Sequence, residues 1–245
     1  MLMRKIAWFS AGAASAVAAK LSAADVVAYC HTGAEDKDNH RFLLDCQSWF
    51  GKTIEILKSD KYDSTWDVWE DRKYIAGPSG APCTGALKRL PREAFQRPDD
   101  IHVFGYTADK ADAKRAIQFA ENWPELKLEF PLIDLGLTKQ AVLHIVEDAG
   151  IALPITYAQG YEHANCMPCP KSSSPDYWAL VRKTHPAEFW RMAKLSRRLG
   201  ARLVIINGQR MFIDEIPNDW PTRNPVQPAC DFLCQIVEKD LLGYE

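Results

Sequence analysis

Five of the seven cysteines stand at positions that suit metal binding or sulfur chemistry, because they lie in predicted loops or at the ends of predicted elements: Cys83, Cys166, Cys169, Cys230 and Cys234. Thiolates bind soft metals and act as nucleophiles, and one Cys-x-x-Cys pair is half of a tetrahedral site. We interpret Cys83, Cys166, Cys169 and Cys234 as ligands of a metal or a cluster. Redox thiols without a metal are the alternative.

The other two cysteines, Cys30 and Cys46, lie inside strand and helix patterns, where a free cysteine is usually a buried core residue.

A run of small residues, Ser10-Ala-Gly-Ala-Ala-Ser15, follows the first predicted strand and opens a predicted helix. Small side chains let the backbone N–H groups at a helix N-terminus approach a phosphate closely. We therefore expect Ser10, Ala11, Gly12 and Ser15 to surround the phosphates of a nucleotide. The alternative is an alanine-rich helix start capped by Ser10.

Two cationic residues are candidates for stabilising charge at such a site. Lys88 follows Cys83 on a predicted helix, and Arg115 lies on the helix after Gly105. A cation near a phosphate or a thiolate stabilises its charge, so Lys88 and Arg115 are predicted to contribute to nucleotide binding. Gly105 is predicted to belong to the same nucleotide site. A solvated basic face is the alternative.

A basic stretch in the C-terminal part, accompanied by Tyr177, Trp178 and Trp190, has the composition of a nucleic-acid contact: Arg182, Lys183, Arg191, Lys194, Arg197, Arg198 and Arg202. It predicts RNA or DNA as a possible partner. The alternative is the solvent-exposed face of an amphipathic helix. The chain as a whole carries a net charge of −2, so it has no overall basic field.

The N-terminal segment has two interpretations. Met1–Lys5 followed by an apolar, alanine-rich stretch is similar to a secretory signal peptide. However, residues 25–30 supply a second strand after the predicted helix and complete a βαβ unit that cleavage would destroy. We therefore expect a cytoplasmic protein, and no apolar run is long enough to cross a membrane.

The elements that must position these residues alternate along the first 150 residues. Strands are predicted at 6–9, 25–30, 53–57, 101–106 and 127–133, with helices at 14–23, 38–49, 84–96, 109–121 and 138–149. Such alternation predicts an α/β fold with a five-stranded, mostly parallel, doubly wound sheet. Ligands of such sheets bind beyond the carboxyl ends of the strands.

From residue 151 the pattern changes to a proline-rich loop around Cys166 and Cys169, an amphipathic helix after Pro186, and a hairpin between 203–207 and 211–216. We expect a nucleotide-binding core over 1–150, with 151–245 as a helical, cysteine-bearing extension packed on it.

Four stretches resemble one known family: Ser10–Ser15, Cys83–Lys88, Gly105–Arg115 and Pro131–Cys169. The family is that of the phosphoadenosine-phosphosulfate reductases, within the superfamily that also holds the PP-loop ATP pyrophosphatases (the HUP type), and the chain is similar to its phage-encoded relatives. The most specific stretch is the last, which contains Pro154-Ile-Thr-Tyr-Ala-Gln-Gly-Tyr161 and then Cys166-x-x-Cys169.

The resemblance implies an adenine nucleotide, either ATP or a phosphoadenosine-phosphosulfate-like molecule, and a 4Fe–4S cluster, with zinc as the alternative. Ala14 stands where PP-loop enzymes carry an aspartate, which argues against metal-assisted ATP cleavage. Pro82 replaces the first member of the family's Cys-Cys pair, so a cluster would have three ligands, with a fourth position open or filled from the tail. An open position resembles the arrangement in cluster-dependent tRNA thiolases.

Three functions follow as expectations. The preferred one is ATP-activated sulfur transfer to a nucleic-acid base or a similar acceptor. The second is reduction of an activated sulfate, in which a tail thiol such as Cys230 or Cys234 attacks sulfur and Lys88 supplies charge. The third is a nucleotide-binding sensor or inhibitor without turnover, whose cysteines hold a structural zinc.

Overall fold

The computed structural model describes residues 3–77, 80–164 and 166–226, and within them the chain forms two compact units. Unit 1 comprises the described residues of Met1–His31, Lys37–Lys58 and Leu90–Ile155. Unit 2 comprises those of Thr32–Asp36, Ser59–Arg89 and Thr156–Glu245. Two segments that precede residue 150 therefore belong to the same unit as the C-terminal part of the chain.

Unit 1 is built on a five-stranded sheet with the strand order β3-β2-β1-β4-β5, in which every neighbouring pair is parallel. Its strands are β1 (Lys5–Phe9), β2 (Val26–Cys30), β3 (Ile54–Leu57), β4 (Ile101–Val103) and β5 (Lys127–Glu129). The α/β fold and the five predicted strands are thus confirmed, and the sheet is Rossmann-like.

The N-terminal strand β1 is the central strand of the sheet. Ile6 is paired in register with Val26 of β2 on one side and with His102 of β4 on the other. Residues 6–9 are buried, as expected for a strand whose two faces are both covered.

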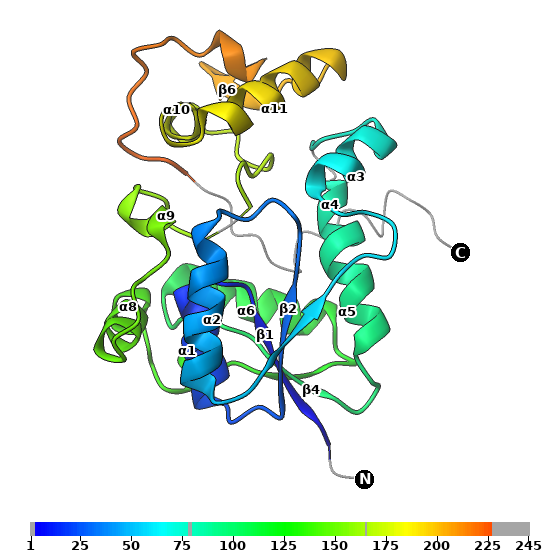
Figure 1. Cartoon of the computed structure of the whole chain (residues 1–245), viewed down its shortest axis with the longest axis vertical. Coiled ribbons are helices and arrows are strands. Elements are labelled where there is room, and N and C mark those ends of the chain that lie inside the picture. Colours follow the sequence, from blue (N-terminus) through cyan, green and yellow to red (C-terminus); the bar gives the residue numbers. More distant parts are fainter. Residues whose placement is uncertain (1–2, 78–79, 165, 227–245) are drawn as a thin grey trace. The chain divides into compact units, whose positions relative to one another are not determined.

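The helices of unit 1 are α1 (Ala13–Leu21), α2 (Asp38–Phe50), α5 (Leu90–Phe95), α6 (Lys110–Asn122), α7 (Pro131–Asp134) and α8 (Lys139–Asp148). Helix α1 contacts α2, α7 and α8, whereas α5 packs near β3. Figure 1 shows α1 and α2 on one side of the sheet and α5 on the other. A short helix, α9 (Ile155–Ala158), follows α8.

Two predicted strands end earlier than expected. The strand predicted to reach Ile133 stops at Glu129 because Pro131 starts α7, and proline favours the first turn of a helix. The strand predicted to reach Tyr106 stops at Val103, and residues 104–107 form a loop.

Unit 2 contains α3 (Thr65–Arg72), α4 (Pro82–Thr84), the π-helical turn η1 (Gly85–Arg89), α10 (Pro175–Thr184), α11 (Pro186–Arg198), β6 (Val204–Ile206), β7 (Gln209–Met211) and the 3-10 helix η2 (Ile213–Glu215). The helix predicted over 84–96 is confirmed as an uninterrupted helical stretch over 82–95, in which the π-helical turn η1 separates α4 from α5. Helix α3 was not predicted, although Ser64 and Asp67 form a capping box at its start.

The amphipathic helix after Pro186 is confirmed as α11, which buries Phe189, Met192 and Leu195. The hairpin is confirmed as the antiparallel pair β6–β7. Its second strand begins two residues earlier than expected because Asn207 and Gly208, both at positive φ, make the two-residue turn.

Unit 2 has its own hydrophobic core, in which aromatic side chains of α3 and α10 pack with those of α11. Trp69 and Trp178 are among its largest buried members, and Cys169 belongs to it.

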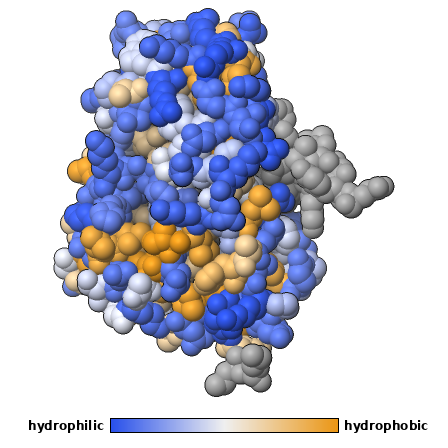
Figure 2. All heavy atoms as spheres, turned by 45° about the vertical axis from the view of Figure 1, so that its right-hand side comes forward, coloured by the Kyte–Doolittle hydropathy of each residue, from blue (hydrophilic) through white to orange (hydrophobic). Residues whose placement is uncertain are grey.

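The face shown in Figure 2 is mostly hydrophilic, with a broad apolar area and several smaller apolar spots. Large exposed apolar side chains of the described residues include Ile56, Leu90 and Ile117. None of the helices that the structure describes has both the length and the apolar character needed to span a membrane.

Candidate functional site

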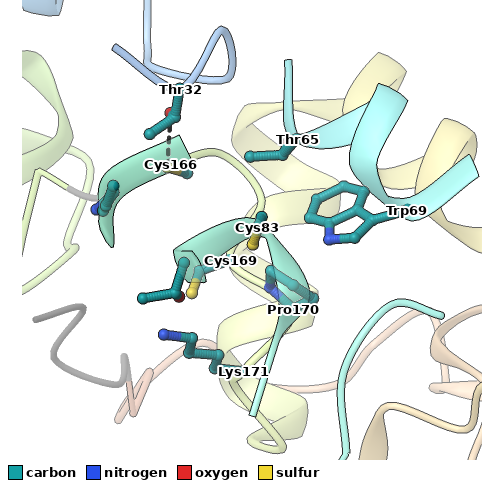
Figure 3. Close-up of a pocket in the computed structure, with 10 residues that line it drawn as sticks. Thr32, Thr65, Trp69, Cys83, Cys166, Cys169, Pro170 and Lys171 are labelled. Carbon is teal, nitrogen blue, oxygen red and sulfur yellow. Dashed lines mark hydrogen bonds between the residues drawn. The ribbon is translucent and has the colours of Figure 1, made fainter. Parts of the chain in front are cut away.

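Cys83, Cys166 and Cys169 line a single pocket that belongs entirely to unit 2 (Figure 3). Their segments lie far apart in the sequence, and the sequence analysis predicted that the three would act together. The same pocket is lined by two lysines, Lys88 and Lys171.

The wall that carries Cys83 is formed by α4 and η1. Pro82 occupies the first turn of α4, so Cys83 is presented directly after the helix start. The π-helical turn η1 follows and carries Lys88, whose side chain lines the cysteine pocket. A π-turn is rare and is found frequently at functional sites.

The wall that carries Cys166 and Cys169 is a loop held by two backbone hydrogen bonds. The N–H of Met167 donates to the carbonyl oxygen of Ala34 at 2.7 Å, and the N–H of Cys169 donates to the Tyr177 hydroxyl at 2.6 Å. Tyr177 is fully buried, and burial raises the pKa of its hydroxyl well above the usual value, which keeps it protonated. The loop is therefore anchored at both ends of the cysteine pair.

Thr32 joins the cysteine loop to a third segment of unit 2. Its hydroxyl lies 3.0 Å from the Cys166 Sγ and donates to Glu35 Oε1 at 2.8 Å. Since the hydroxyl has one proton and gives it to Glu35, Cys166 is the donor in the contact with Thr32. The N–H of Thr65 donates to the Thr32 carbonyl oxygen at 3.0 Å, which ties α3 to the same segment.

Three residues that line the pocket each carry a buried polar atom without a hydrogen-bond partner in the described protein: Thr65 Oγ1, Thr84 Oγ1 and Trp69 Nε1. The three residues are at most 2% exposed. Buried polar groups of native proteins are nearly always satisfied, and an exception points to an ion, a water or a ligand. The indole nitrogen of Trp69 is drawn in Figure 3.

Cysteine sulfur is the kind of ligand that a soft metal or an iron–sulfur cluster prefers, and three cysteines contribute to this lining. The pocket is not a preformed chelate: over the described residues, no three His, Cys, Asp or Glu side chains are arranged to hold a metal ion. Binding of a metal would therefore require the side chains of Cys83, Cys166 and Cys169 to reorient.

The predicted phosphate loop lies in unit 1, between β1 and α1. Ser15 Oγ donates to the Gly12 carbonyl oxygen at 2.9 Å and accepts from the Ser10 N–H at 3.0 Å. It is also 3.0 Å from Ser10 Oγ. The Ser15 hydroxyl therefore holds the loop in shape, while Ser10 is exposed and Ala11 takes a positive φ of 56°.

Gly105 has a packing reason for being glycine. A Cβ at this position would lie 2.6 Å from the Ser15 nitrogen and 2.7 Å from the Ala14 carbonyl carbon. The loop after β4 therefore passes close to the start of α1. This is the point between β1 and β4 where the strand order reverses, and open parallel sheets bind ligands there.

Arg115 remains in unit 1 with the loop that carries Gly105. Its guanidinium pairs with Asp112 at 2.7 Å and lies over the Tyr106 ring, 5.2 Å from the centroid. Lys88, which was predicted to serve the nucleotide, belongs to unit 2. Its role at the nucleotide stays a prediction.

The tail cysteines Cys230 and Cys234 lie outside the described residues, so their predicted roles as nucleophile and fourth ligand stay predictions. Cys46 is a buried core residue, and burial raises the pKa of its thiol to about 12.

Most of the predicted basic stretch is occupied by contacts within unit 2. Arg197 pairs with Asp214 and Glu215, Arg198 pairs with Glu70, and Arg182 donates to three carbonyl oxygens of 216–218. Arg191 lies over the Trp66 ring. Trp190 and Lys194, one turn apart on α11, are exposed.

Sequence reasoning missed six residues of the cysteine pocket: Thr32, Thr65, Trp69, Thr84, Pro170 and Lys171. A local signal existed only for α3, in the Ser64–Asp67 capping box. Nothing local to Thr32 or Lys171 indicates that they face cysteines from other segments.

The chain matches no protein-family model and no curated protein.

Proposed function

We propose that this protein performs adenine-nucleotide-dependent sulfur chemistry, preferably ATP-activated sulfur transfer to a nucleic-acid base or a similar acceptor. The observation that carries the proposal is that Cys83, Cys166 and Cys169, from distant parts of the chain, line one pocket with Lys88. The Rossmann-like sheet of unit 1 supports the nucleotide part of the proposal, and we assign it to the PP-loop type with a cysteine-bearing C-terminal part.

A 4Fe–4S cluster is the group we propose for the pocket, held by Cys83, Cys166 and Cys169. Such a cluster, when bound by three thiolates, supplies an iron that is free to take up an external sulfur atom. Lys88 and Lys171 add positive charge to the pocket lining, which offsets the negative charge that three thiolates bring.

For the nucleotide, we propose a site beyond the carboxyl ends of the neighbouring strands β1 and β4. Helix α1 begins directly after the loop 10–12, and the N–H groups and dipole of a helix N-terminus favour a phosphate. The Ser15 hydroxyl holds this loop, and Gly105 allows the next loop to pass close by. Trp190 and Lys194 on α11 are the exposed side chains we propose for contact with a nucleic-acid acceptor.

Metal analysis of protein purified without air tests the proposal directly. We expect iron and acid-labile sulfide in the wild-type protein, and loss of both in Cys83→Ala, Cys166→Ala and Cys169→Ala. Cys30→Ala is the matched control, because Cys30 lies at the end of β2 in unit 1 and should leave the iron content unchanged. A colourless wild-type protein with one zinc would instead support the sensor or inhibitor.

Product analysis separates the two enzyme activities. Release of pyrophosphate from ATP that depends on added RNA would support sulfur transfer. Formation of adenosine bisphosphate from an activated sulfate donor would support the reductase. Iron-loaded protein with neither activity would contradict both.

A further inference from the structure

The two cysteines of the Cys166-Met-Pro-Cys169 loop differ in their access to solvent. Cys166 is partly exposed, whereas Cys169 is buried and only 3% exposed. Both line the same small cavity of about 10 Å³, which has room for about one water molecule (Figure 3). Two thiols at this spacing, one within reach of a solute and one protected, suit thiol–disulfide exchange.

The surroundings of Cys166 favour its thiolate, which is the reactive form of a thiol. The Thr32 hydroxyl lies 3.0 Å from the Cys166 sulfur, and Thr32 is only 2% exposed. Once Cys166 has lost its proton, this hydroxyl is able to donate a hydrogen bond to the sulfur. Lys88 and Lys171 line the same pocket, and nearby cations also stabilise a thiolate. Cys166 is therefore the nucleophile of the pair.

Cys169 is held in place inside the protein. Its N–H donates to the Tyr177 hydroxyl at 2.6 Å, and the N–H of Met167 donates to the Ala34 carbonyl oxygen at 2.7 Å. Burial raises the pKa of the Tyr177 hydroxyl well above its usual value, and the thiols of Cys169 and Cys166 raise it further. Both sulfurs therefore lie within electrostatic reach of one buried hydroxyl. Because Cys169 is screened from solutes, its natural reaction partner is Cys166.

We propose that Cys166 and Cys169 form a redox dithiol that reduces small disulfides, of which glutathione disulfide is the probe. The Cys166 thiolate attacks one sulfur of the substrate, the substrate S–S bond breaks, and one substrate thiolate leaves. Cys169 then attacks the Cys166 sulfur, and the second substrate thiolate leaves. Two electrons pass from the protein sulfurs to the substrate, and the protons of the two thiols end on the two released thiols. This activity goes beyond the proposed function and needs no bound metal.

Peptide mapping of reduced, chelator-treated protein tests the proposal. The full-length chain is mixed with excess glutathione disulfide without air, the remaining thiols are alkylated, and the protein is digested with trypsin. Trypsin releases Cys166 and Cys169 in one peptide, 140–171, which holds no other cysteine. We expect this peptide to lose two hydrogen atoms as its internal disulfide forms, with release of reduced glutathione.

Cysteine variants test the order of attack. Cys169→Ser should stop at the mixed disulfide, so that peptide 140–171 carries one glutathione on Cys166. Cys166→Ser should acquire neither an internal disulfide nor glutathione. Cys30→Ala is the control and should react like the wild type, because Cys30 lies at the end of β2 in unit 1.

The threonine contact gives a second test that keeps both cysteines. Thr32→Val removes the hydroxyl that stabilises the Cys166 thiolate, so the reaction with glutathione disulfide should slow roughly 10-fold. Thr32→Ser keeps the hydroxyl and should keep the wild-type rate. Equal rates in the two variants would overturn the role given to Thr32 in this reaction.

Two results would overturn the redox dithiol itself. One is a wild-type peptide 140–171 that keeps both thiols under excess glutathione disulfide. The other is a disulfide that joins this peptide to peptide 74–88, because that bond would make Cys83 the partner. The iron content of untreated protein decides the proposed function, whereas the disulfide of chelator-treated protein decides this inference, so each can fail without the other.

Discussion

The hydroxyl of Thr32 lies 3.0 Å from the sulfur of Cys166, although 134 residues separate the two in the chain. The same hydroxyl donates to Glu35. This contact draws the segment after β2 into the wall of the cysteine pocket. A Cys166 thiolate has no proton to donate, so the Thr32 hydroxyl would then donate its hydrogen bond to the sulfur instead of to Glu35. Thr32 can therefore stabilise the charged form of the cysteine.

Thr32→Val should weaken iron retention because it removes the donor to the Cys166 thiolate. Loss of one such outer contact lowers metal affinity by roughly 10-fold in other sites. We expect iron to pass to a chelator about that much faster in Thr32→Val. Thr32→Ser keeps the hydroxyl and is the matched control. Equal rates in the two variants would show that the hydroxyl does not act on the metal.

Thr65→Val and Thr84→Val should stabilise the metal-free protein. Each replaces a buried hydroxyl that has no partner in the described protein by a methyl group of similar size. Burial of an unsatisfied hydroxyl costs about 1 kcal/mol or more, so the free energy of unfolding should rise by about that amount. Urea unfolding of metal-free protein measures this. A decrease would mean that each hydroxyl is satisfied in the metal-free protein.

Gly105→Ala should destabilise unit 1 because the added Cβ meets backbone atoms of Ala14 and Ser15, which have little freedom to move. We expect a loss of about 3 kcal/mol in the free energy of unfolding. Gly136→Ala serves as the control: it has open space around its Cβ and only a positive φ of 66°, so it should lose about 1 kcal/mol. Similar losses in both would exclude the close approach of the two loops.

The stability of the protein should fall as the pH decreases from 6.5 to about 4. His102 is buried and accepts a hydrogen bond from the Trp8 indole, and burial, helped by Arg92, lowers its pKa from 6.5 to about 4. The unfolded chain therefore binds a proton in this range that the folded protein excludes. The free energy of unfolding is therefore unaffected by His102 above pH 6.5, and it falls by at most about 3 kcal/mol as the pH decreases to about 4.

The effect of His102 is separable from that of the carboxylates. The pKa values of Asp38 and Asp100 are already below 3.8, so these two groups add little slope in this window. His102→Gln, which keeps an acceptor for Trp8, should flatten the dependence of the unfolding free energy on pH. His144→Gln, on an exposed position of α8, should leave the slope unchanged. An identical slope in both variants would assign the effect to other groups.

The alternation of strands and helices in unit 1 was predictable from the sequence, because each element carries its own local signal. Apolar runs such as residues 6–9 and 26–30 are typical of strands that are buried on both faces. The periodic pattern after Pro186 likewise indicated α11. Local signals failed where competing ones met, as at Pro131, where a helix start replaced the end of a predicted strand.

Only part of the cysteine pocket could be predicted from the sequence. The types and positions of Cys83, Cys166 and Cys169 indicated sulfur chemistry, and the family resemblance pointed to the same three residues. Their presence in one pocket, together with Thr32, Thr65 and Trp69, was decided by tertiary structure. The physical reason is that this pocket is closed by contacts between distant segments, such as Thr32 with Cys166 and Met167 with Ala34. Local periodicity carries no record of such contacts, and neither does it record which buried hydroxyls are left without a partner.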